Sequence, residues 1–534
     1  MSVESSEGGL EAPGGTESAG LPEGWAWVKL ADILSEPTTN GRSVRSDDDG
    51  FPVLRLTALK RDGVDCSEHK LGDWTAEEAA PYLIQPGDFL VSRGNGSLSL
   101  VGRGALVTSV TEPVAFPDTM IRIRTSPDHV DPRFLAHLWS SPAIRRQVEK
   151  SARTGTGIHK VSQAAVQEVE FALPPTAEQH RIADALDARL SHLDKIESRL
   201  MAAQRRLNHL RNFAMTAAAT GVLAWDADSQ HLPIAGAPGV KDGTLPLLAS
   251  GWRWTRLQDI ADVVGGVSKD SKNQHDPALP EVPYLRVANA QRARLDLSQV
   301  SKIRVPPKTL AKLRLRDGDL LMTEGGDRDK LGRGWIWADE IEDCIHQNHL
   351  FRARILDQAT HPKLLGWYVN SAARSWFEDN GKQSVNLASI SISKVKMLPV
   401  PVPPPDEAEQ AGFVELGERV LARFDRLVSA CEKGLGNAAA LRRTLLSEAL
   451  SGRLLPQDPD NESAEDLLKR IRAEREAAEV ERKAARRAAA QAKRKRHVGS
   501  KAPAPADTPP PPAPTSDTLL PEGEQDTLPL EFTA

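Results

Sequence analysis

The segment GWAWVKLADI at residues 24–33 returns as GWRWTRLQDI at residues 251–260, and this recurrence determines the expected fold. Four further segment pairs follow in the same order at a spacing of about 230 residues. They are VLRLTAL at 53–59 with YLRVANA at 284–290, GDFLVSRGNGSLSLVGRG at 87–104 with GDLLMTEGGDRDKLGRG at 318–334, DTMIRIR at 118–124 with NHLFRAR at 348–354, and PPTAEQ at 174–179 with PPPDEAEQ at 403–410. Because five landmarks keep their order and spacing, we interpret the chain as an internal duplication.

Each copy begins with a part that is typical of a mainly β domain. Short apolar runs alternate with polar residues, as in Met-Ile-Arg-Ile-Arg at 120–124, and are interrupted by Gly, Pro and Asp turns. The glycine-rich segments lack a G-x-G-x-x-G motif that leads into a helix, so a dinucleotide site is not expected.

Each copy ends with a long helix that carries a heptad-like apolar seam and stops at a glycine, Gly221 or Gly452. The predicted seam residues are Ile182, Leu186, Leu193, Ile196, Leu200, Leu207 and Leu210 in the first helix, and Phe413, Val420, Phe424, Leu427, Ala438, Leu441 and Leu445 in the second. Two seams in one chain can cover each other by pairing. The alternative is two amphipathic helices that each pack on their own domain.

These patterns predict an α+β fold with a pseudo-two-fold internal repeat. Two mainly β domains alternate with two long helices that pair as an antiparallel coiled coil. The expected boundaries are a disordered leader at 1–23, a first β domain at 24–173, a helical spacer at 174–223, a linker at 224–250, a second β domain at 251–402, a second spacer at 403–455, a charged C-terminal helix at 456–497 and a disordered Pro-rich tail at 498–534.

Composition limits the possible functions. The formal net charge is −5, but residues 25–455 carry 55 basic and 53 acidic side chains, so the charge balance alone does not indicate a nucleic-acid binder. No apolar run is long enough to span a bilayer, and the acidic N-terminus does not resemble a secretory signal, so a cytoplasmic location is expected. The three cysteines, Cys66, Cys344 and Cys431, lack metal-ligand spacing and are interpreted as small core residues.

Catalytic motifs are missing from the sequence. PPPDEAEQ resembles a helicase acidic box only in its letters, because no G-x-x-x-x-G-K-[ST] phosphate loop accompanies it, and we expect it to start a helix. No [DNS]-P-P-[YFW] motif of an amino-methyltransferase is present. His346 and His349 lack a paired carboxylate or cysteine cluster, which favours polar readers or core groups over metal ligands. We therefore expect neither a catalytic nor a metal site.

In its order of landmarks the chain resembles the specificity subunits of type I restriction-modification systems. The resemblance covers about residues 22–480 and rests on the helix openings PPTAEQHRIADAL and PPPDEAEQAGFVEL, the helix ends LRNFAMTAAATGVL and LRRTLLSEALSGRL, and the segments GDLLMTEGGDRDKLGRGWIW, HQNHLFRARI and DLLKRIRAERE. No single motif is sufficient, but the duplicated order is specific.

The resemblance implies a non-catalytic subunit whose two β domains are target recognition domains for a bipartite double-stranded DNA site. The helices would hold these domains apart and dock two modification subunits. Those partners would bind S-adenosylmethionine and methylate adenine, and separate restriction and translocase subunits would use ATP and Mg²⁺. No cofactor is expected in this chain.

The candidate DNA-contacting residues lie on glycine-loosened loops, where Arg, Lys, Asn and Gln can reach purine edges or phosphates. The candidates are Arg93, Asn95, Ser97, Arg153, Thr154, Thr156, His159 and Lys160 in the first copy, and Arg328, Lys330, Arg333, Lys382, Gln383, Ser384 and Asn386 in the second. Any one of them can instead be a polar turn residue. In alignment, Glu324 and Asp327 replace Arg93 and Gly96, so the two copies are expected to read different half-sites.

Two other functions stay open on the sequence. One is a self-contained DNA-modifying or DNA-cleaving enzyme with an unfamiliar site, which would act without partners. The other is a coiled-coil scaffold without DNA binding, for which a duplicated β domain has no evident use.

Overall fold

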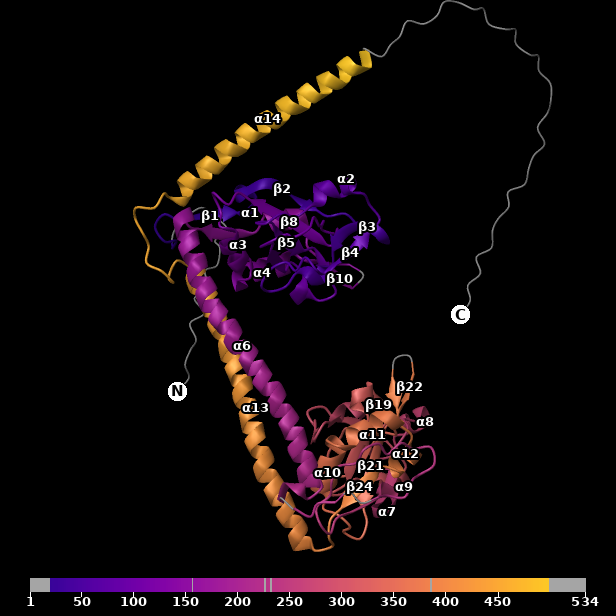
Figure 1. Cartoon of the computed structure of the whole chain (residues 1–534). Coiled ribbons are helices and arrows are strands. Elements are labelled where there is room, and N and C mark those ends of the chain that lie inside the picture. The colour runs from indigo at the N-terminus through magenta and orange to yellow at the C-terminus, as the bar shows by residue number, and fades with distance from the viewer. Residues whose placement is uncertain (1–19, 156, 225–226, 231–232, 385–386, 499–534) are drawn as a thin grey trace, which may run out of the picture. The chain divides into compact units, whose positions relative to one another are not determined.

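A computed structural model describes residues 20–155, 157–224, 227–230, 233–384 and 387–498. The chain divides into two units (Figure 1). The described residues of the first fall within Met1–Pro132, Val148–Ala177 and Asp458–Ala534, and those of the second within Arg133–Gln147 and Glu178–Gln457.

An antiparallel four-stranded sheet lies in the first unit. Its strands follow the order β2 (Leu34–Asn40), β8 (Met120–Thr125), β5 (Phe89–Ser92) and β7 (Gly104–Leu106). The alternating run that predicted a strand is β8, and its Met120, Ile121 and Ile123 are fully buried. Strand β8 lies between two other strands, and both its faces are covered. Apolar residues that point to either face of the sheet therefore contribute to the core.

The second unit repeats this arrangement with β13 (Ala261–Gly265), β21 (Leu350–Ile355) and β18 (Leu320–Thr323) in the order 13-21-18. A further sheet has the order β17 (Ser301–Arg304), β14 (Glu281–Leu285) and β20 (Ile345–His346). In each copy a short pair of strands joins the start of the β-rich segment to its end. The pairs are β1 (Ala26–Lys29) with β11 (Glu170–Leu173) and β12 (Arg253–Arg256) with β24 (Pro399–Val402).

A buried ion pair recurs in both copies. Arg124 donates to Asp88 from Nη2 at 2.8 Å, and Arg354 donates to Asp319 from Nη2 at 2.7 Å. Both carboxylates are fully buried, so each guanidinium supplies the two hydrogen bonds that a desolvated carboxylate needs. The shared pair supports the internal repeat at the level of individual side chains.

Several short elements complete the β-rich parts. They are α1 (Leu30–Ile33), α2 (Ala76–Ala79), α3 (Pro132–Trp139), α4 (Pro142–Ser151), α5 (Gln163–Gln167), α7 (Leu257–Ile260), α8 (Ser271–Gln274), α9 (Pro307–Leu313), α10 (Pro362–Asn370), α11 (Ala373–Asn380), α12 (Ile392–Lys396), β3 (Ser46–Leu54), β4 (His69–Gly72), β15 (Ala290–Gln291) and β16 (Arg294–Leu295).

The two long helices are α6 (Thr176–Ala219) and α13 (Glu407–Leu450), each of 44 residues. The expected helix start in PPPDEAEQ is found, because Asp406 caps α13 by accepting a hydrogen bond from the Glu409 amide at 3.0 Å. Gly221 follows α6 with φ +75°, and a Cβ there would lie 2.6 Å from the Trp252 indole nitrogen. A left-handed glycine with no room for a side chain thus ends the helix.

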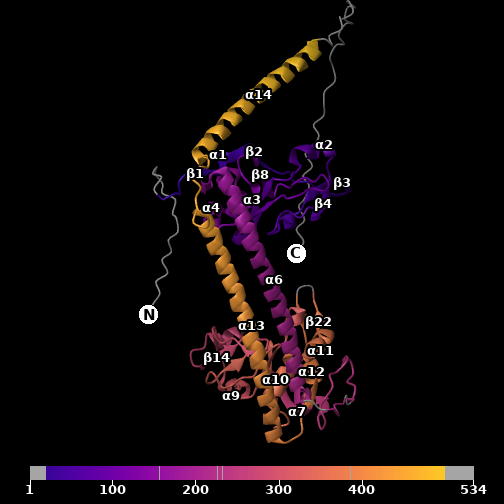
Figure 2. The same cartoon turned by 60° about the vertical axis from the view of Figure 1, so that its left-hand side comes forward.

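Helices α6 and α13 run side by side in opposite directions (Figures 1 and 2). Polar contacts that join them include Asp194 with Arg442 at 2.6 Å, Gln204 with Glu432 at 3.3 Å, and Arg211 with Asp425 at 2.6 Å. Residue numbers rise along one helix as they fall along the other, by similar intervals. The predicted fold class, two β-rich domains with two long antiparallel helices, is therefore confirmed.

The predicted seam needs a correction. Buried or partly buried residues form one regular row along each helix. On α6 they are Leu186, Leu190, Leu193, Glu197, Leu200, Gln204, Leu207, Arg211, Ala214 and Ala218, and on α13 they are Val414, Gly417, Leu421, Phe424, Val428, Cys431, Leu435, Ala438, Arg442, Leu445 and Ala449. Their spacing alternates between three and four residues, as in a coiled coil. Ile182 is buried, whereas Phe413 and Val420 are half-buried neighbours of Val414 and Leu421.

Four predicted seam residues instead face outward. Ile196 is 48% exposed, Leu210 41%, Leu427 52% and Leu441 48%. Each directly precedes a seam position, and three of those positions hold the polar residues Glu197, Arg211 and Arg442. The apolar pattern therefore placed these four predicted seam residues one position before the residues of the seam itself.

The last described helix is α14 (Ala464–Val498), which belongs to the first unit. Leu467, Leu468 and Ile471, the apolar cluster of this segment, are buried. The Ala464 amide donates to the Gly24 carbonyl at 2.8 Å, and Arg475 donates to the Ala31 carbonyl at 2.9 Å. The start of α14 thus packs against the start of the first β-rich segment.

Candidate nucleic-acid interface

In the first copy, a small sheet brings together the two segments that carry the candidate residues. Its strands have the order β6 (Gly94–Asn95), β10 (Ile158–Lys160) and β9 (Arg153–Gly155). His159 lies opposite Asn95 on one side and Thr154 on the other. The glycine loop and the RTGTGIHK segment, about 60 residues apart in the sequence, therefore form one surface.

The second copy repeats this sheet with β19 (Gly325–Gly326), β23 (Ala388–Ser389) and β22 (Lys382–Gln383) in the order 19-23-22. Ser389 lies opposite Gly325 on one side and Lys382 on the other. A Cβ on Gly325 would lie 3.2 Å from the Ala388 carbonyl oxygen, so glycine allows the two strands to approach closely.

Most candidate side chains in these sheets reach solvent. Exposed candidates are Ser97, Arg153, Thr154, Lys160, Arg328, Lys382, Gln383 and Ser384, and partly exposed ones are Arg93, Asn95, His159, Lys330 and Arg333. Thr156 and Asn386 lie outside the described residues. The adjoining Ile158 and Leu387 are 42% and 59% exposed, so each surface also presents an apolar side chain.

Several candidates of the first copy are held by neighbours. Asn95 accepts a hydrogen bond from the Ser97 amide at 3.1 Å, and Thr154 and His159 share one of 3.0 Å between the hydroxyl and Nδ1. Arg93 donates from Nη1 to the Asp118 carbonyl at 3.3 Å. These contacts fix the loop, whereas Arg153 and Lys160 extend from it.

The second copy differs at the positions that the alignment indicated. The amides of Arg93 and Glu324 donate to equivalent carbonyls, of Thr119 and His349, at 2.8 and 3.0 Å. Glu324 therefore replaces Arg93 at the same backbone position, and its carboxylate pairs with His349 Nδ1 at 2.7 Å. One copy presents a cation where the other presents an anion.

The second glycine loop carries charges of both signs. Lys330 pairs with Asp327, and the hydrogen bond from its ammonium group lowers the pKa of that carboxyl. Arg328 donates from Nη2 to the Glu378 carbonyl at 3.1 Å. Gln383 and Ser384 donate to the carbonyls of Ser384 and Leu387, so Lys382 is the exposed charged candidate of β22.

The segment Gly-Arg-Gly at 332–334 is fixed by close packing. Gly332 has φ +67°, and a Cβ there would lie 2.4 Å from the Phe377 ring. A Cβ on Gly334 would lie 1.7 Å from the Leu321 carbonyl oxygen. Both glycines are therefore required, and they hold the backbone of Arg333 in one position.

Two arginines near Arg333 were missed by the sequence analysis. Positive charge from Arg374 and from Arg333 contributes, after burial, to a lowered pKa of Arg292, so the three guanidiniums lie close together. Arg292 follows β15 and Arg374 belongs to α11, far from the glycine loop in sequence. The available signal was their recurrence in the first copy, at Arg61 and Arg145.

The histidines and cysteines singled out in the sequence lie in structural settings. His346 is fully buried, its Nδ1 hydrogen-bonds the Leu350 carbonyl at 2.8 Å, and burial lowers its pKa to about 4. Cys344 and Cys431 are buried, and Cys66 is partly buried and packs against an apolar core cluster of the first unit. In the described part of the chain, no group of three or more His, Cys, Asp or Glu side chains is arranged to hold a metal ion.

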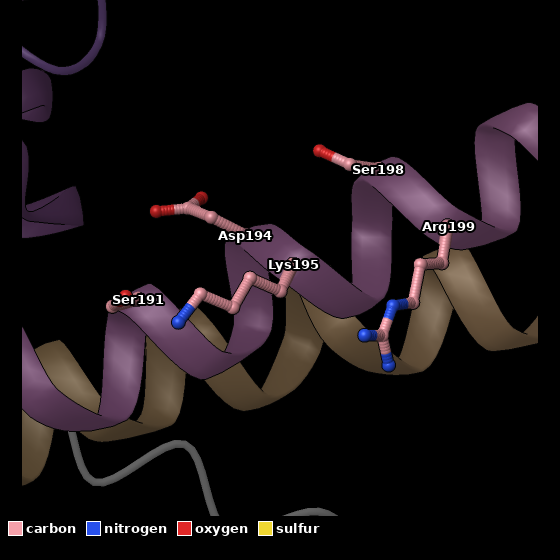
Figure 3. Close-up of a pocket in the computed structure, with 5 residues that line it drawn as sticks. All are labelled: Ser191, Asp194, Lys195, Ser198 and Arg199. Carbon is pink, nitrogen blue, oxygen red and sulfur yellow. The ribbon is translucent and has the colours of Figure 1, made fainter.

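Figure 3 shows a shallow open depression along α6, lined by Ser191, Asp194, Lys195, Ser198 and Arg199. Lys195 and Arg199 extend to one side of the helix, and Asp194 and Ser198 extend to another. Asp194 pairs with Arg442, so it serves the helix contact. The residues that line it include no histidine or cysteine.

Known proteins share this combination of repeat and helices. A family model described as the type I restriction modification DNA specificity domain matches residues 22–203. The StySPI specificity subunit of a type I restriction enzyme from Salmonella potsdam is 24% identical over 473 residues, which cover 85% of this chain and 96% of that protein. The EcoDI specificity subunit from Escherichia coli is 24% identical over 488 residues, covering 86% and 97%. The chain is thus similar to type I restriction enzyme specificity subunits over most of its length.

The fold of this chain is also found in a solved structure of a type I R-M system. That chain is 20% identical, has a TM-score of 0.59, and the match covers 81% of the present chain and 99% of the other. Among the described residues of the present chain, every helix is too short or too polar to span a bilayer.

Proposed function

We propose that this chain is the non-catalytic subunit that selects the DNA sequence for a type I restriction-modification complex, and that it recognises a bipartite site. The observation that carries the proposal is the pair of small sheets, β6-β10-β9 and β19-β23-β22. In each copy, two loops distant in sequence meet in one sheet whose polar side chains reach solvent. One such surface for each half of a divided site accounts for the duplication.

The chemistry of the two surfaces suits the reading of base edges. Arginine and lysine donate to guanine, and asparagine and glutamine bind adenine through paired hydrogen bonds. Arg153 and Lys160 on the first surface, and Lys382 and Gln383 on the second, supply such groups in exposed positions. Because Glu324 replaces Arg93, we expect the two half-sites to differ in sequence.

The helix pair is suited to separate the two readers. A helix of 44 residues is about 66 Å long, close to two turns of B-DNA at roughly 34 Å each. The spacer length of the target is therefore expected to reflect the length of α6 and α13.

The outward-facing apolar residues of the helices support docking of two identical modification subunits. Ile196, Leu210, Leu427 and Leu441 each precede a seam residue by one position. This heptad position lies on the same side of both helices in an antiparallel pair. Since Ile196 corresponds to Leu427 and Leu210 to Leu441 in the repeat, the strip has pseudo-two-fold symmetry and can receive the same partner twice.

The partners supply the chemistry in this proposal. Modification subunits bind S-adenosylmethionine and transfer its methyl group to adenine, and restriction and translocase subunits use ATP and Mg²⁺. The complex acts on DNA in the cytoplasm. No cofactor binds to the specificity subunit itself.

The test compares genome-wide adenine methylation in strains with and without the gene. We expect one bipartite motif to be methylated only when the gene is present. Purified chain incubated alone with DNA, S-adenosylmethionine and Mg²⁺ should leave the DNA unchanged. Modification or cleavage by the chain alone, or identical methylation in both strains, would overturn the proposal.

A further inference from the structure

Three arginines from separate segments of the second unit converge beside the glycine loop. Arg292 follows β15, Arg333 lies between Gly332 and Gly334, and Arg374 is in the first turn of α11. Each is partly exposed, so the cluster can be reached from solvent. The sheet β19-β23-β22 begins in the same loop.

Asn370 fixes the backbones that carry these arginines. Its Oδ1 accepts hydrogen bonds from the amides of Ala293 and Gly334 at 3.1 and 3.4 Å. Its Nδ2 donates to the carbonyls of Gly334 and Gly366 at 2.9 and 2.8 Å. One fully buried amide thus joins the turn after Arg292, the Gly-Arg-Gly segment and the end of α10, so the cluster is positioned in advance.

In the described part of the chain, the positive charge of this cluster is offset only in part, by the nearby negative charges of Asp329 and Glu378 acting on Arg292. No carboxylate there forms an ion pair with Arg292, Arg333 or Arg374. Arg292 is satisfied by two carbonyl oxygens, those of Asp329 at 2.6 Å and Asn370 at 3.4 Å. The buried Nε atoms of Arg333 and Arg374 have no hydrogen-bond partner among the described residues.

Physical chemistry makes such an arrangement costly without a ligand. Burial, followed by the positive charge of Arg374, lowers the pKa of Arg292 to about 10. Like charges held together in a partly desolvated site repel one another. An anion that accepts hydrogen bonds from the solvent-accessible ends of several guanidiniums relieves the repulsion.

The same three positions hold arginine in the first copy of the repeat. Alignment of the landmarks pairs Arg61 with Arg292, Arg103 with Arg333 and Arg145 with Arg374. This recurrence contrasts with the glycine loop, where Glu324 replaces Arg93. The arginines are shared by two domains that we expect to read different sequences, so their ligand is common to both half-sites.

We propose that Arg292, Arg333 and Arg374 form a binding site for one phosphate group of the DNA backbone beside the second half-site. The site rests on the proposed function and deepens it. Phosphate contacts fix the register of a protein on the duplex, whereas base contacts select the sequence. The cluster sets the position of the domain, and the exposed side chains of β22 read the bases.

The test uses the full subunit assembled with its modification subunits and two labelled duplexes, one with the methylated site and one of unrelated sequence. We expect Arg292→Gln and Arg374→Gln each to weaken binding to both duplexes by a similar factor, roughly 10-fold. The slope of log affinity against log salt concentration should become shallower by about 0.9 for each phosphate charge that is no longer neutralised. Arg374→Lys, which keeps the charge, should retain most of the slope.

Arg253→Gln is the matched control, because it removes an exposed arginine of β12 in the same unit. It should leave affinity and slope unchanged. Without DNA, Arg374→Gln should unfold at the same temperature as the wild type or higher, since it relieves repulsion. Arg292→Gln is left out of this comparison because it also loses the hydrogen bonds to the carbonyls of Asp329 and Asn370.

Three results would overturn the phosphate site. They are unchanged affinity and salt slope in both glutamine variants, weakening confined to the target duplex, or a clear fall in the unfolding temperature of Arg374→Gln that shows a structural role. Methylation by the wild-type complex shows whether the phosphate site alone has failed or the proposed function as well. If it methylates no bipartite site, the proposed function fails, whereas normal methylation with unaffected variants contradicts the phosphate site alone.

Discussion

At the scale of single residues, two buried polar side chains of the second unit carry testable consequences. Asn370 forms four hydrogen bonds to three separate segments, and His346 is fully buried with one ring nitrogen bonded to the Leu350 carbonyl. The His346 Nε2 atom has no hydrogen-bond partner among the described residues, which favours the neutral ring.

We expect Asn370→Ala to destabilise the second unit by about 2–4 kcal/mol, because it leaves buried amides and carbonyls without partners. Urea unfolding followed by tryptophan fluorescence measures the change. Asn437→Ala, at an exposed position of α13, is the control and should cost nothing measurable. Equal stability of the two variants would show that Asn370 does not hold the segments together.

Because His346 is buried and neutral, we expect the folded chain to lose stability in mild acid. Its pKa is lowered to about 4 in the folded chain, chiefly by burial, with Arg352 and Arg354 also disfavouring the charged ring and Asp319 favouring it. The unfolded state, with a pKa near 6.5, therefore binds the proton first as the pH falls. The stability that the neutral His346 gives to the folded chain is fully present above about pH 6.5 and is lost between about pH 6.5 and 4. The loss amounts to about 3 kcal/mol at most.

The measurement compares urea unfolding of the wild type and His346→Asn across that pH range. The wild type should lose more stability than the variant, and the exposed His275→Asn serves as the control for removal of a histidine. Parallel profiles for the wild type and His346→Asn would contradict this role for the buried imidazole.

At the scale of elements, the helix pair separates two kinds of apolar residue that the sequence presents together. Leu193 is 6% exposed and faces α13, whereas Ile196, one turn further on, is 48% exposed. The heptad position, and not hydrophobicity alone, decides which of them stabilises the fold.

We expect Leu193→Asp to disrupt the helix pair, since it buries a carboxylate without a partner at a cost of roughly 3 kcal/mol or more. Loss of helical circular dichroism at lower temperature measures this effect. Ile196→Asp should keep the wild-type unfolding temperature but reduce assembly with the modification subunits, as measured by light scattering. If Leu193→Asp unfolds like the wild type, or Ile196→Asp assembles normally, the two faces have been assigned wrongly.

At the scale of the whole molecule, the duplication was predictable because landmarks such as GWAWVKLADI and GWRWTRLQDI repeat in order. Helix ends were predictable for a local reason, a proline start and a glycine stop. The exact seam was not, because Glu197, Arg211 and Arg442 occupy contact positions that an apolar pattern does not detect. The arginine cluster also escaped, since it depends on three segments that only tertiary structure brings together.

Exchange of residues 25–173 for the corresponding domain of a relative with a different target is the decisive experiment for two independent reading domains. We predict that sequencing of methylated adenines in cells with this chimera will show one half of the bipartite site replaced and the other half intact. Each domain carries its own reading surface, and its boundaries at Gly24 and Pro174 leave α6 untouched. A methylated site altered in both halves, from a chimera that still assembles, would contradict the assignment of one half-site to each domain.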